Sequence, residues 1–587
     1  MNEQRKPSEE KVYLKNYPKG AAETSLPKTK LDEYFLNING KEQERTGMIY
    51  APTGEEILIG QMIEKYEDTV KALIGMGLEP KDNVAVCLLN VPEMIYTILA
   101  CSKLGVTINM VNPMAEPADI IARINSLNPK ALIAQDKTAP LFTGIKDYIN
   151  VPNIITAPIV EGYTNADMEP LDKNVGFWSD FINNGKYVTK TFEVPYDETT
   201  PFIYAHSSGS TGPTKTIELG HNTFTHTAHM HAVAGLDIEP GDKWLATIPA
   251  IFSTGVNSSV VLPLLIKMAL ILEPNYDPDA YLQNILRFAP RAEIATKYFH
   301  KCMLYDPRFN GVDLSFLRYP VIGGEKVRRH ESRKFDSFLE EHNNFYGVGN
   351  GSGQCELGGG VANSCLNEKS KGNNTIGFPY THNTITIRDL ETAEEVDYNQ
   401  RGEITVQTTT GMLGYAGMPE KTQEYYKNGE ANTGDLGYVN ENGEYYIDGR
   451  ISDFIKISDD VKLYPYEIED IVEDFLESDP IFDEIVKDYA VHGVMNGEFE
   501  IPMLQLHIAD EYMDRAEAII NYLYKEINNK ISSDKQIAAY KIRTEAFPST
   551  SAGKTDLGSF KIETEGFVTV DENQKLKPYV LKLGTRK

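Results

Sequence analysis

The sequence predicts an α/β fold, and three features along the chain support that prediction. Between about residue 55 and residue 300, stretches with helical periodicity alternate with short apolar strands, an order typical of parallel sheets flanked by helices. From about residue 375 to residue 450, shorter segments alternate polar and apolar residues, which indicates a small β-rich lobe. After Arg450, strands and helices alternate again. We therefore expect a large amino-terminal domain, 1–451, that includes the lobe, and an α+β carboxy-terminal domain, 452–587.

Individual segments of the large domain show helical periodicity or the short apolar pattern of buried strands. We expect helices at 57–77 and 92–105, each ending in glycine, and strands at 83–89 and 129–135. The longest apolar run, at 259–272, is interrupted by Pro263 and Lys267. It is shorter than the ~20 residues that a membrane helix needs, so we expect a core helix there and no integral membrane association.

The lobe and the carboxy-terminal domain carry their own signals. Strands are expected at 384–390, 402–409 and 443–449. The Asn442-Gly443 pair between alternating flanks indicates a hairpin. Residues 454–478 read as two short strands and a helix that starts near Tyr464, and a second helix is expected from Met513 to Ile531. The change of pattern after Arg450 places the domain boundary near Ser452.

Composition narrows the class of protein. The chain has 587 residues, 41% hydrophobic and 24% charged, which is ordinary for a globular enzyme. Acidic residues outnumber basic ones by 85 to 57, and the net charge of −28 disfavours nucleic acid and anionic lipid as partners. The five cysteines form no CxxC pair, and the first 20 residues lack the apolar core of a signal peptide. We therefore expect a cytoplasmic protein.

A loop rich in Ser, Gly and Thr lies in the stretch YAHSSGSTGPTKTIEL, at 204–219. Such loops present backbone and hydroxyl donors to phosphate oxygens. The loop is not a Walker motif, because no glycine precedes Lys215 and Pro213 lacks the N–H that a phosphate nest uses. On its own, the cluster would also suit an ordinary turn between two strands.

Read together with four further stretches, the loop resembles the phosphate-binding loop of the adenylate-forming superfamily, which includes acyl- and aryl-CoA synthetases. The further stretches occur in the order that the superfamily has: PAIFSTG at 249–255, VIGGEKV at 321–327, NTGDLGYVNENGEYYIDGR at 432–450 and FPSTSAGKTD at 547–556. The resemblance covers essentially the whole chain. It implies the two-domain α/β fold described above, with a mobile carboxy-terminal domain.

The resemblance implies that a carboxylate attacks the α-phosphorus of ATP, giving an acyl adenylate and pyrophosphate, and that the acyl group then passes to a thiol. It implies ATP, Mg²⁺ and CoA as ligands and a small-molecule carboxylic acid as substrate. The expected ATP-binding residues are Ser207, Ser208, Gly209, Ser210, Thr211, Gly212, Lys215, Gly324, Glu325, Ser352, Cys355, Asp435, Ile447 and Arg450. The expected acyl pocket contains Phe252, Val256, Asn257, Gly323 and Gly351, which favour an uncharged apolar or aromatic acid.

Five residues carry the expected metal-binding, ribose-binding, catalytic and hinge roles. By resemblance, Glu356 in NGSGQCELGG is the Mg²⁺ ligand, and Asp435 accepts hydrogen bonds from the ribose hydroxyls. On its own, the stretch TGDLG would also suit a turn in which Asp435 has no ligand role. Lys554 would bridge the carboxylate and the phosphate ester in the first half-reaction. The two domains would pivot at Ser452, which would bring Lys456 to the site for thiol transfer.

This sequence departs from the superfamily pattern at two places. Ser352 stands where an adenine-stacking tyrosine is usual, and Cys355 stands where a threonine is usual. An alternative alignment to the motif uses Tyr346 as the tyrosine but puts Asn350 at the position of the glutamate. Asp459 and Asp460 replace a glycine-containing turn near the path of CoA, where two carboxylates would be unfavourable. The departures leave two alternatives open. The acceptor would be a separate carrier protein or another group, or the chain would be a catalytically silent nucleotide-binding relative.

The segment HNTFTHTAHMH contains four histidines, His221, His226, His229 and His231. His226 and His229 are close to one helical turn apart, as metal ligands can be. No carboxylate joins them at helical spacing, so we expect a polar helix face.

Overall fold

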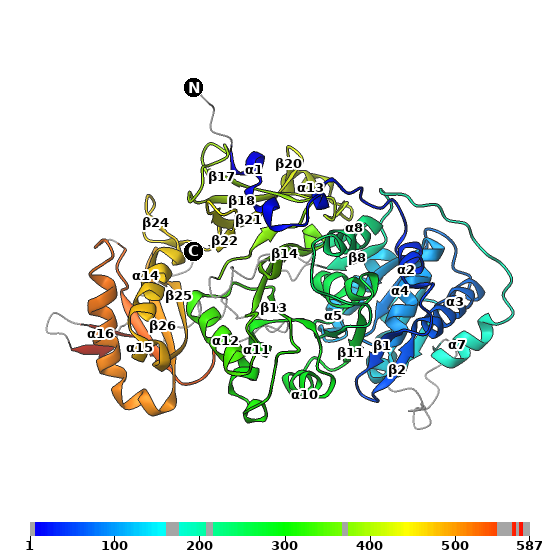
Figure 1. Ribbon diagram of the computed structural model, residues 1–587, viewed down its shortest axis with the longest axis horizontal. Coiled ribbons are helices and arrows are strands. Elements are labelled where there is room, and N and C mark those ends of the chain that lie inside the picture. The colour runs from blue at the N-terminus through cyan, green and yellow to red at the C-terminus, as the bar shows by residue number, and fades with distance from the viewer. Residues whose placement is uncertain are drawn as a thin grey trace.

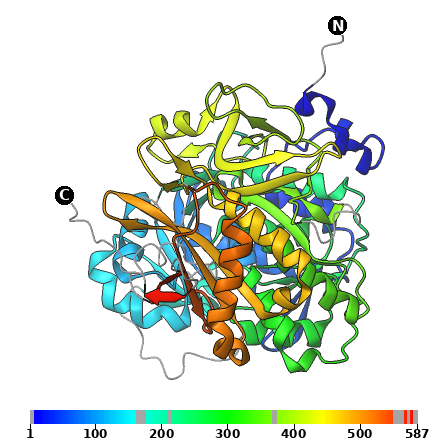
Figure 2. The ribbon, with the colours of Figure 1, turned by 90° about the vertical axis from the view of Figure 1, so that its left-hand side faces the viewer.

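The structure is a computed structural model that describes residues 6–159, 175–206, 215–366, 374–533, 535–548, 566–570 and 575–578. Two large sheets occupy the centre and right of Figure 1, the β-rich lobe lies at the top, and the elements after residue 452 lie at the left. Figure 2 shows those last elements in front of the segment that carries α12 and below the lobe. The α/β fold class is confirmed.

The first large sheet has eight strands in the order β19-β9-β8-β4-β3-β5-β6-β7. From β8 to β7 all neighbours are parallel, whereas β9 and β19 are antiparallel additions at one edge. The strands are β3 (Asn83–Cys87), β4 (Thr107–Met110), β5 (Ala131–Gln135), β6 (Ile154–Ala157), β7 (Val175–Phe177), β8 (Ile203–His206), β9 (Thr216–Leu219) and β19 (Gly414–Tyr415). Every residue of β5 is buried, as expected for a strand covered on both faces.

The second large sheet has nine strands in the order β16-β15-β14-β13-β12-β10-β11-β1-β2. Its central strands, from β14 to β1, are parallel. The strands are β1 (Thr46–Tyr50), β2 (Glu55–Leu58), β10 (Lys243–Ala246), β11 (Ala269–Leu272), β12 (Ala292–Ala295), β13 (Tyr319–Gly323), β14 (Gly349–Gln354), β15 (Gly359–Asn363) and β16 (Phe378–Pro379).

The helices before residue 342 pack with these two sheets around three apolar cores, except for α1, which lies against the β-rich lobe. They are α1 (Pro7–Glu10), α2 (Leu31–Asn39), α3 (Ile59–Gly75), α4 (Pro92–Leu104), α5 (Pro117–Leu127), α6 (Ala139–Ile145), α7 (Trp178–Gly185), α8 (His221–Ala232), α9 (Leu262–Leu265), α10 (Pro278–Phe288), α11 (Lys297–Tyr305) and α12 (Arg329–Glu341). The helices expected at 57–77 and 92–105 are confirmed as α3 and α4. Helix α4 ends at Gly105, whose φ of 63° suits a residue without a Cβ.

The prediction of a core helix over the apolar run 259–272 is wrong for the last residues of the run, which form a strand. The run begins in a π-helical segment, η6 (Gly255–Val261), continues through α9, and ends as the buried strand β11. Lys267 has a φ of 68°, which ends the helical stretch between α9 and β11. A fully buried strand and a buried helix both read as continuous apolar runs, so periodicity does not separate them. Within the ranges given above, none of the helices has the length and apolarity that a bilayer crossing needs.

The β-rich lobe contains a five-stranded sheet, in which β22 pairs with β21 beside the order β17-β18-β21-β20. Its elements are β17 (Thr384–Arg388), β18 (Gly402–Gln407), α13 (Pro419–Tyr425), β20 (Tyr426–Lys427), β21 (Glu430–Val439) and β22 (Tyr445–Arg450). The predicted hairpin is confirmed: Val439 pairs with Tyr445, and Gly443 in the turn has a φ of 84°. The α1 segment lies against this lobe through Ser8, which donates to Glu395.

The elements after residue 452 enclose an apolar core of their own, whose members lie between Ile455 and Val570. They are β23 (Ile455–Lys456), β24 (Lys462–Leu463), α14 (Pro465–Ser478), α15 (Pro480–Ile485), β25 (Val486–Asn496), β26 (Phe499–Ile508), α16 (Ala516–Asn528), β27 (Ala539–Arg543), β28 (Val568–Val570) and β29 (Leu576–Pro578). The two short strands and the helix expected at 454–478 are confirmed as β23, β24 and α14. The second expected helix is α16, which is shorter at both ends.

Candidate functional site

The serine- and glycine-rich loop joins two antiparallel strands, β8 and β9, at one edge of the first sheet. The predicted phosphate-binding residues Ser207, Ser208, Gly209, Ser210, Thr211 and Gly212 lie outside the described residues, whereas both flanks of the loop are described. His206, the last residue of β8, is hydrogen-bonded through Nε2 to Asn109 at 2.8 Å and through Nδ1 to Thr216 at 3.3 Å. Burial, followed by the nearby Arg123, lowers the pKa of His206 to about 4. A neutral, doubly hydrogen-bonded histidine therefore ties the two flanks of the loop to the sheet.

Lys215 and Glu356 meet at one aromatic side chain, Tyr415. The Lys215 ammonium lies over the Tyr415 ring, 4.7 Å from its centroid. The Tyr415 hydroxyl donates a hydrogen bond of 3.0 Å to Glu356 Oε1. Sequence reasoning selected Lys215 and Glu356 but missed Tyr415, because its contacts depend on strands far apart in the chain.

Glu356 lies on a short 3₁₀ turn, η8 (Cys355–Leu357), between β14 and β15. The turn ends at Gly358, where a φ of 76° and the close Thr410 carbonyl leave no room for a Cβ. Asn257 is buried and donates through Nδ2 to the Gly358 carbonyl at 2.6 Å. Met412 N–H donates to the Glu356 carbonyl at 2.8 Å. The backbone of the proposed metal ligand is therefore held from two sides.

Three tyrosines surround the Glu356 carboxylate: Tyr415, Tyr425 and Tyr426. Burial raises the pKa of all three hydroxyls, and the charge of Glu356 raises each pKa further. Tyr425 donates to Gln354 Oε1 at 3.2 Å, and Tyr426 donates to the Met412 carbonyl at 3.1 Å. The hydroxyls therefore stay protonated at neutral pH and act as donors.

Asp435 and Arg450 face each other as a cross-strand pair of β21 and β22. Arg450 Nε lies 3.0 Å from Asp435 Oδ1, and Gln354 Nε2 donates to Asp435 Oδ2 at 2.9 Å. Gln354 also donates to the Thr433 carbonyl at 2.8 Å. Burial raises the pKa of the Asp435 carboxyl, and Arg450 and Gln354 offset part of that rise. Gln354, which sequence reasoning missed, thus joins the Glu356 turn to the predicted ribose acceptor.

The remaining predicted nucleotide residues lie on neighbouring strands and turns. Ser352 and Cys355 are half-buried on β14 and η8, and Ile447 is half-buried on β22. Gly324 follows β13 with a φ of 89°. Glu325 Oε2 lies 3.9 Å from Lys297 Nζ.

Tyr346, the other candidate for stacking on adenine, lies against a guanidinium. The Arg318 guanidinium carbon is 3.5 Å from the centroid of the Tyr346 ring. In this structure the ring therefore already has a stacking partner from its own chain.

The predicted acyl-pocket residues fall into two groups. Gly323 on β13 and Gly351 on β14 are adjacent in register, and a Cβ at Gly323 would lie 3.2 Å from Ile294 Cδ1. Phe252 is half-buried, whereas Val256 and Asn257 are fully buried in η6. Asn257 is already engaged with Gly358, as described above.

The predicted residues of the carboxy-terminal domain are exposed or lie outside the described residues. Lys456 Nζ pairs with Asp459 Oδ1 at 2.8 Å on the surface. Ser452 is exposed between β22 and β23 and donates to Asp453 Oδ1 at 3.3 Å. Lys554 lies outside the described residues. One of the two aspartates that the CoA path would encounter is thus paired with the lysine proposed for thiol transfer.

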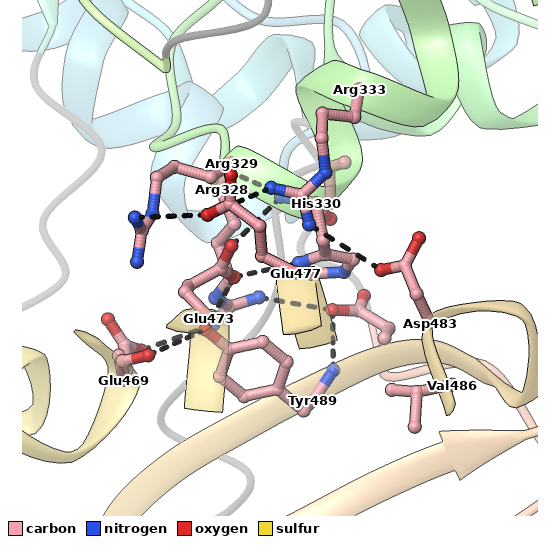
Figure 3. A network of polar contacts seen from close by, with 12 residues as sticks. Arg328, Arg329, His330, Arg333, Glu469, Glu473, Glu477, Asp483, Val486 and Tyr489 are labelled. Atoms are coloured by element: carbon pink, nitrogen blue, oxygen red, sulfur yellow. Dashed lines mark hydrogen bonds and ion pairs between the residues drawn. The ribbon is translucent and has the colours of Figure 1, made fainter. Parts of the chain in front are cut away.

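A network of buried charges holds the carboxy-terminal elements against the α11–α12 region (Figure 3). Arg328 pairs with Asp488 at 3.1 Å and with Glu469 at 3.3 Å, and its guanidinium carbon lies 4.4 Å from the Tyr489 ring centroid. Burial alone would lower the pKa of Arg328, but the surrounding carboxylates raise it well above its ordinary value. The guanidinium is therefore charged and is paired with two carboxylates across the interface.

The same network continues along the amino-terminal end of α12 (Figure 3). His330 binds Glu473 twice, through its backbone N–H at 2.9 Å and through Nδ1 at 2.8 Å. Burial alone would raise the pKa of Glu473, but hydrogen bonds from His330 and Tyr489 lower it to about 2. Lys334 donates to the carbonyls of Asp483 and Val486 at 2.6 and 2.7 Å. One face of α12 is thus matched to the acidic face of α14 and to the start of β25.

A polar cavity of about 220 Å³ lies beside this network, between the lobe and α14. Arg401 of the lobe lines it and pairs with Asp448 and Asp470, both at 2.8 Å. At roughly 30 Å³ per water molecule, the cavity has room for several waters. The interface therefore combines buried ion pairs with a polar cavity large enough to hold water.

The expectation of a polar helix face for the four histidines is wrong for His221 and His226, which are buried on α8. His226 Nδ1 lies 2.9 Å from the Thr409 hydroxyl, and Nε2 lies 3.1 Å from the Pro27 carbonyl. Burial lowers the pKa of His226 to about 4. The helix packs between segments on several sides, which the sequence pattern did not indicate.

Comparisons with known proteins bear on the family and the fold of this chain. A family model described as AMP-binding enzyme matches residues 40–416. A long-chain-fatty-acid–CoA ligase from Bacillus subtilis (strain 168) is 23% identical over 482 residues, which cover 78% of this chain and 84% of that protein. An anthranilate CoA ligase solved with anthranoyl-AMP superposes with a TM-score of 0.76 at 19% identity, covering 92% of this chain and 98% of that one. An amide bond synthetase from Marinactinospora thermotolerans has a TM-score of 0.73 at 19% identity, with 90% and 99% covered. At these identities the two structures establish a shared fold alone.

Proposed function

The chain belongs to the family of AMP-binding enzymes, and from that membership we propose that it uses ATP to activate a carboxylic acid and then transfers the acyl group to CoA. In the first half-reaction a carboxylate oxygen attacks the α-phosphorus. The bond to the bridging oxygen breaks, and pyrophosphate leaves. In the second half-reaction a thiolate attacks the acyl carbonyl, and AMP leaves.

One observation carries this proposal: residues from four separate segments converge in a single connected set of contacts. Lys215 contacts Tyr415, and Tyr415 contacts Glu356. Gln354, which precedes Glu356 by two residues, contacts Asp435. Arg450 closes the set through its pair with Asp435. A cation, a carboxylate beside it and a second carboxylate with its own arginine match the needs of a triphosphate, its metal ion and a ribose.

Glu356 is the residue that fits Mg²⁺. Proteins usually bind Mg²⁺ through one or two carboxylates together with substrate phosphates, and Glu356 is a half-buried carboxylate close to the phosphate lysine. When bound, Mg²⁺ supplies positive charge that offsets the repulsion between the triphosphate and the incoming carboxylate. Lys215 supplies a second positive charge on the same side.

Asp435 fits the ribose because its carboxylate still has acceptor capacity. An ionised carboxylate offers about four lone-pair sites, and Arg450 and Gln354 use one each. The ribose hydroxyls would donate to the remaining sites. The same two partners hold the carboxylate in place before the nucleotide arrives.

We further propose that the domain boundary lies at Ser452 and that the domains rotate there between the half-reactions. Two apolar cores, one on each side of this residue, support such a division. Lys554 would act in the first half-reaction and Lys456 in the second. The pair between Lys456 and Asp459 would have to open before the lysine contacts the adenylate.

The acceptor is the least constrained part of the proposal. The shared fold includes an amide bond synthetase as well as CoA ligases, so a carrier-protein thiol or an amine is the second candidate. A catalytically silent relative is the third, because Ser352 cannot stack on adenine as a tyrosine would.

The purified protein should be incubated with ATP, Mg²⁺ and a panel of apolar and aromatic carboxylic acids, with CoA, with a carrier protein, or with neither. We expect the matching acid to give an acyl adenylate in every arm and an acyl-CoA thioester when CoA is present, as detected by mass spectrometry. Adenylate without any CoA thioester would overturn the acceptor alone. No adenylate from any acid would overturn the proposed function.

A further inference from the structure

Tyr415 is the one side chain that contacts both the phosphate lysine and the metal carboxylate among the contacts described above. Its ring face lies under the Lys215 ammonium, and its hydroxyl donates to Glu356. A cation is attracted to the negative face of an aromatic ring, and a hydroxyl donor is attracted to a carboxylate. One neutral residue therefore satisfies two opposite charges at once.

The backbone of Tyr415 is fixed to the strand that follows Lys215. On β19, Tyr415 pairs with Ile217 of β9, and Ala416 N–H donates to the Thr216 carbonyl at 2.9 Å. Tyr415 N–H donates to Thr422 Oγ1 at 2.9 Å. The side chain is 5% exposed, so its ring has little freedom to turn away from Lys215.

The residues just before Tyr415 are fixed to the Glu356 turn. Met412 N–H donates to the Glu356 carbonyl at 2.8 Å, and Thr410 Oγ1 donates to the Leu357 carbonyl at 3.0 Å. The segment from Thr410 to Tyr415 thus runs from the metal carboxylate on the second large sheet to the phosphate loop on the first. Tyr415 lies at the end of this connection.

We propose that Tyr415 is a positioning residue that sets the Lys215 ammonium and the Glu356 carboxylate in place for Mg²⁺ and the β- and γ-phosphates. The inference rests on the proposed function, because it takes Glu356 as the metal ligand and Lys215 as a phosphate ligand. A neutral spacer suits this task. A direct ion pair between Lys215 and Glu356 would have to break before either group met its ligand, whereas Tyr415 contacts each group through a neutral ring face or hydroxyl.

Two substitutions separate the two contacts. Tyr415→Phe keeps the ring under Lys215 and removes the hydroxyl that holds Glu356. Tyr415→Leu removes both contacts. Tyr426→Phe is the matched control, because it removes a neighbouring half-buried tyrosine hydroxyl that donates to the Met412 carbonyl instead of to Glu356.

Binding of α,β-methylene-ATP should be measured by calorimetry with and without Mg²⁺, after thermal melting shows that each variant is folded. For Tyr415→Phe we expect Mg²⁺-free binding within about twofold of wild type and about a tenfold smaller enhancement by Mg²⁺, the size of a lost hydrogen bond to a charged group. Tyr415→Leu should also weaken Mg²⁺-free binding by about threefold, the size of an exposed cation–π contact. Tyr426→Phe should match wild type in both conditions.

Two results would overturn the inference while leaving the proposed function standing. One is a Tyr415→Phe variant whose Mg²⁺ enhancement equals that of wild type. The other is an equal loss in Tyr415→Phe and Tyr426→Phe, which would indicate general loosening around Glu356. If the wild type binds no nucleotide under either condition, the proposed function fails, and this inference fails with it.

Discussion

Arg328 Nη1 lies 3.1 Å from Asp488 Oδ1, in an ion pair that joins the α11–α12 region to the first strand of the carboxy-terminal sheet. The two side chains are 14% and 10% exposed, so the pair is largely withdrawn from water. Removing one member of such a pair leaves an unpaired buried charge, which costs about 3–5 kcal/mol. This contact therefore holds the carboxy-terminal elements in the orientation that the structure shows.

Replacing Arg328 should loosen this interface. In Arg328→Gln, Asp488 and Glu469 lose a cation, so we expect faster hydrogen–deuterium exchange in α12 and α14 and unchanged exchange in β3 and β4. The control is Glu424→Gln, which breaks a surface pair with Lys421. Exposed pairs contribute little to stability, so exchange in α12 and α14 should match that of the wild type. Unchanged protection of α14 in Arg328→Gln would show that the network does not hold the domains together.

His226 should make stability depend on pH. Burial holds the pKa of His226 at about 4 in the folded protein, whereas an unfolded histidine titrates near 6.5. Below pH 6.5 the unfolded chain binds a proton that the folded protein does not bind until about pH 4. The stabilisation is therefore complete above pH 6.5 and is lost as the pH falls toward 4.

The substitution His226→Gln isolates this contribution. Denaturant unfolding between pH 6.5 and 4.5 should show a slope that is shallower in the variant by up to about 1.4 kcal/mol per pH unit, the value for one proton. Between pH 7 and 8 the two slopes should agree, because His226 is neutral in both states. Parallel curves over the lower range would contradict a neutral buried His226.

Gln354 should support nucleotide binding without touching the phosphates. In Gln354→Leu, Asp435 Oδ2 loses its amide donor, and we expect AMP to bind about tenfold more weakly at pH 7.5, the scale of a hydrogen bond to a charged group. The matched control is Gln400→Leu, at an exposed turn of the same lobe. An unchanged calorimetric affinity in Gln354→Leu would show that Gln354 does not support binding, and a tighter one would show that it competes with the ribose.

The two lysines of the carboxy-terminal domain should separate the half-reactions. We expect Lys554→Ala to lower adenylate formation by at least about a hundredfold, as loss of a charge-stabilising group does, and to spare thioester formation from supplied acyl adenylate. Lys456→Ala should show the reverse. Separate rate measurements of adenylate formation and of thioester formation test this. An equal loss of both steps in either variant would contradict the proposal that the two lysines act in different half-reactions.

Sequence reasoning predicted the elements whose signals are local. Helices α3 and α4 combine apolar periodicity with a terminal glycine, and the β21–β22 hairpin carries Asn-Gly at its turn, so each was found. Strand β11 was read as part of a helix, because a parallel strand buried on both faces and a buried helix give the same apolar run.

The parts of the site that were missed depend on contacts between distant segments. Tyr415 meets Lys215 only because β19 adds to the edge of β9, and Gln354 meets Asp435 only because the lobe packs against the end of β14. The interface was missed for the same reason. The acidic face of α14 was visible in the sequence, but its basic partner, α12, begins at Arg329, well over one hundred residues earlier.

The most direct test of the whole account is ATP–pyrophosphate exchange that depends on a carboxylic acid, because exchange requires reversible formation of an acyl adenylate. Labelled pyrophosphate, ATP and Mg²⁺ should be supplied with each acid of a broad apolar and aromatic panel, and with no acid. We predict that at least one acid drives label into ATP well above the acid-free rate and that Glu356→Gln abolishes this exchange. Exchange that stays at the acid-free rate for every acid would contradict a carboxylate-activating enzyme.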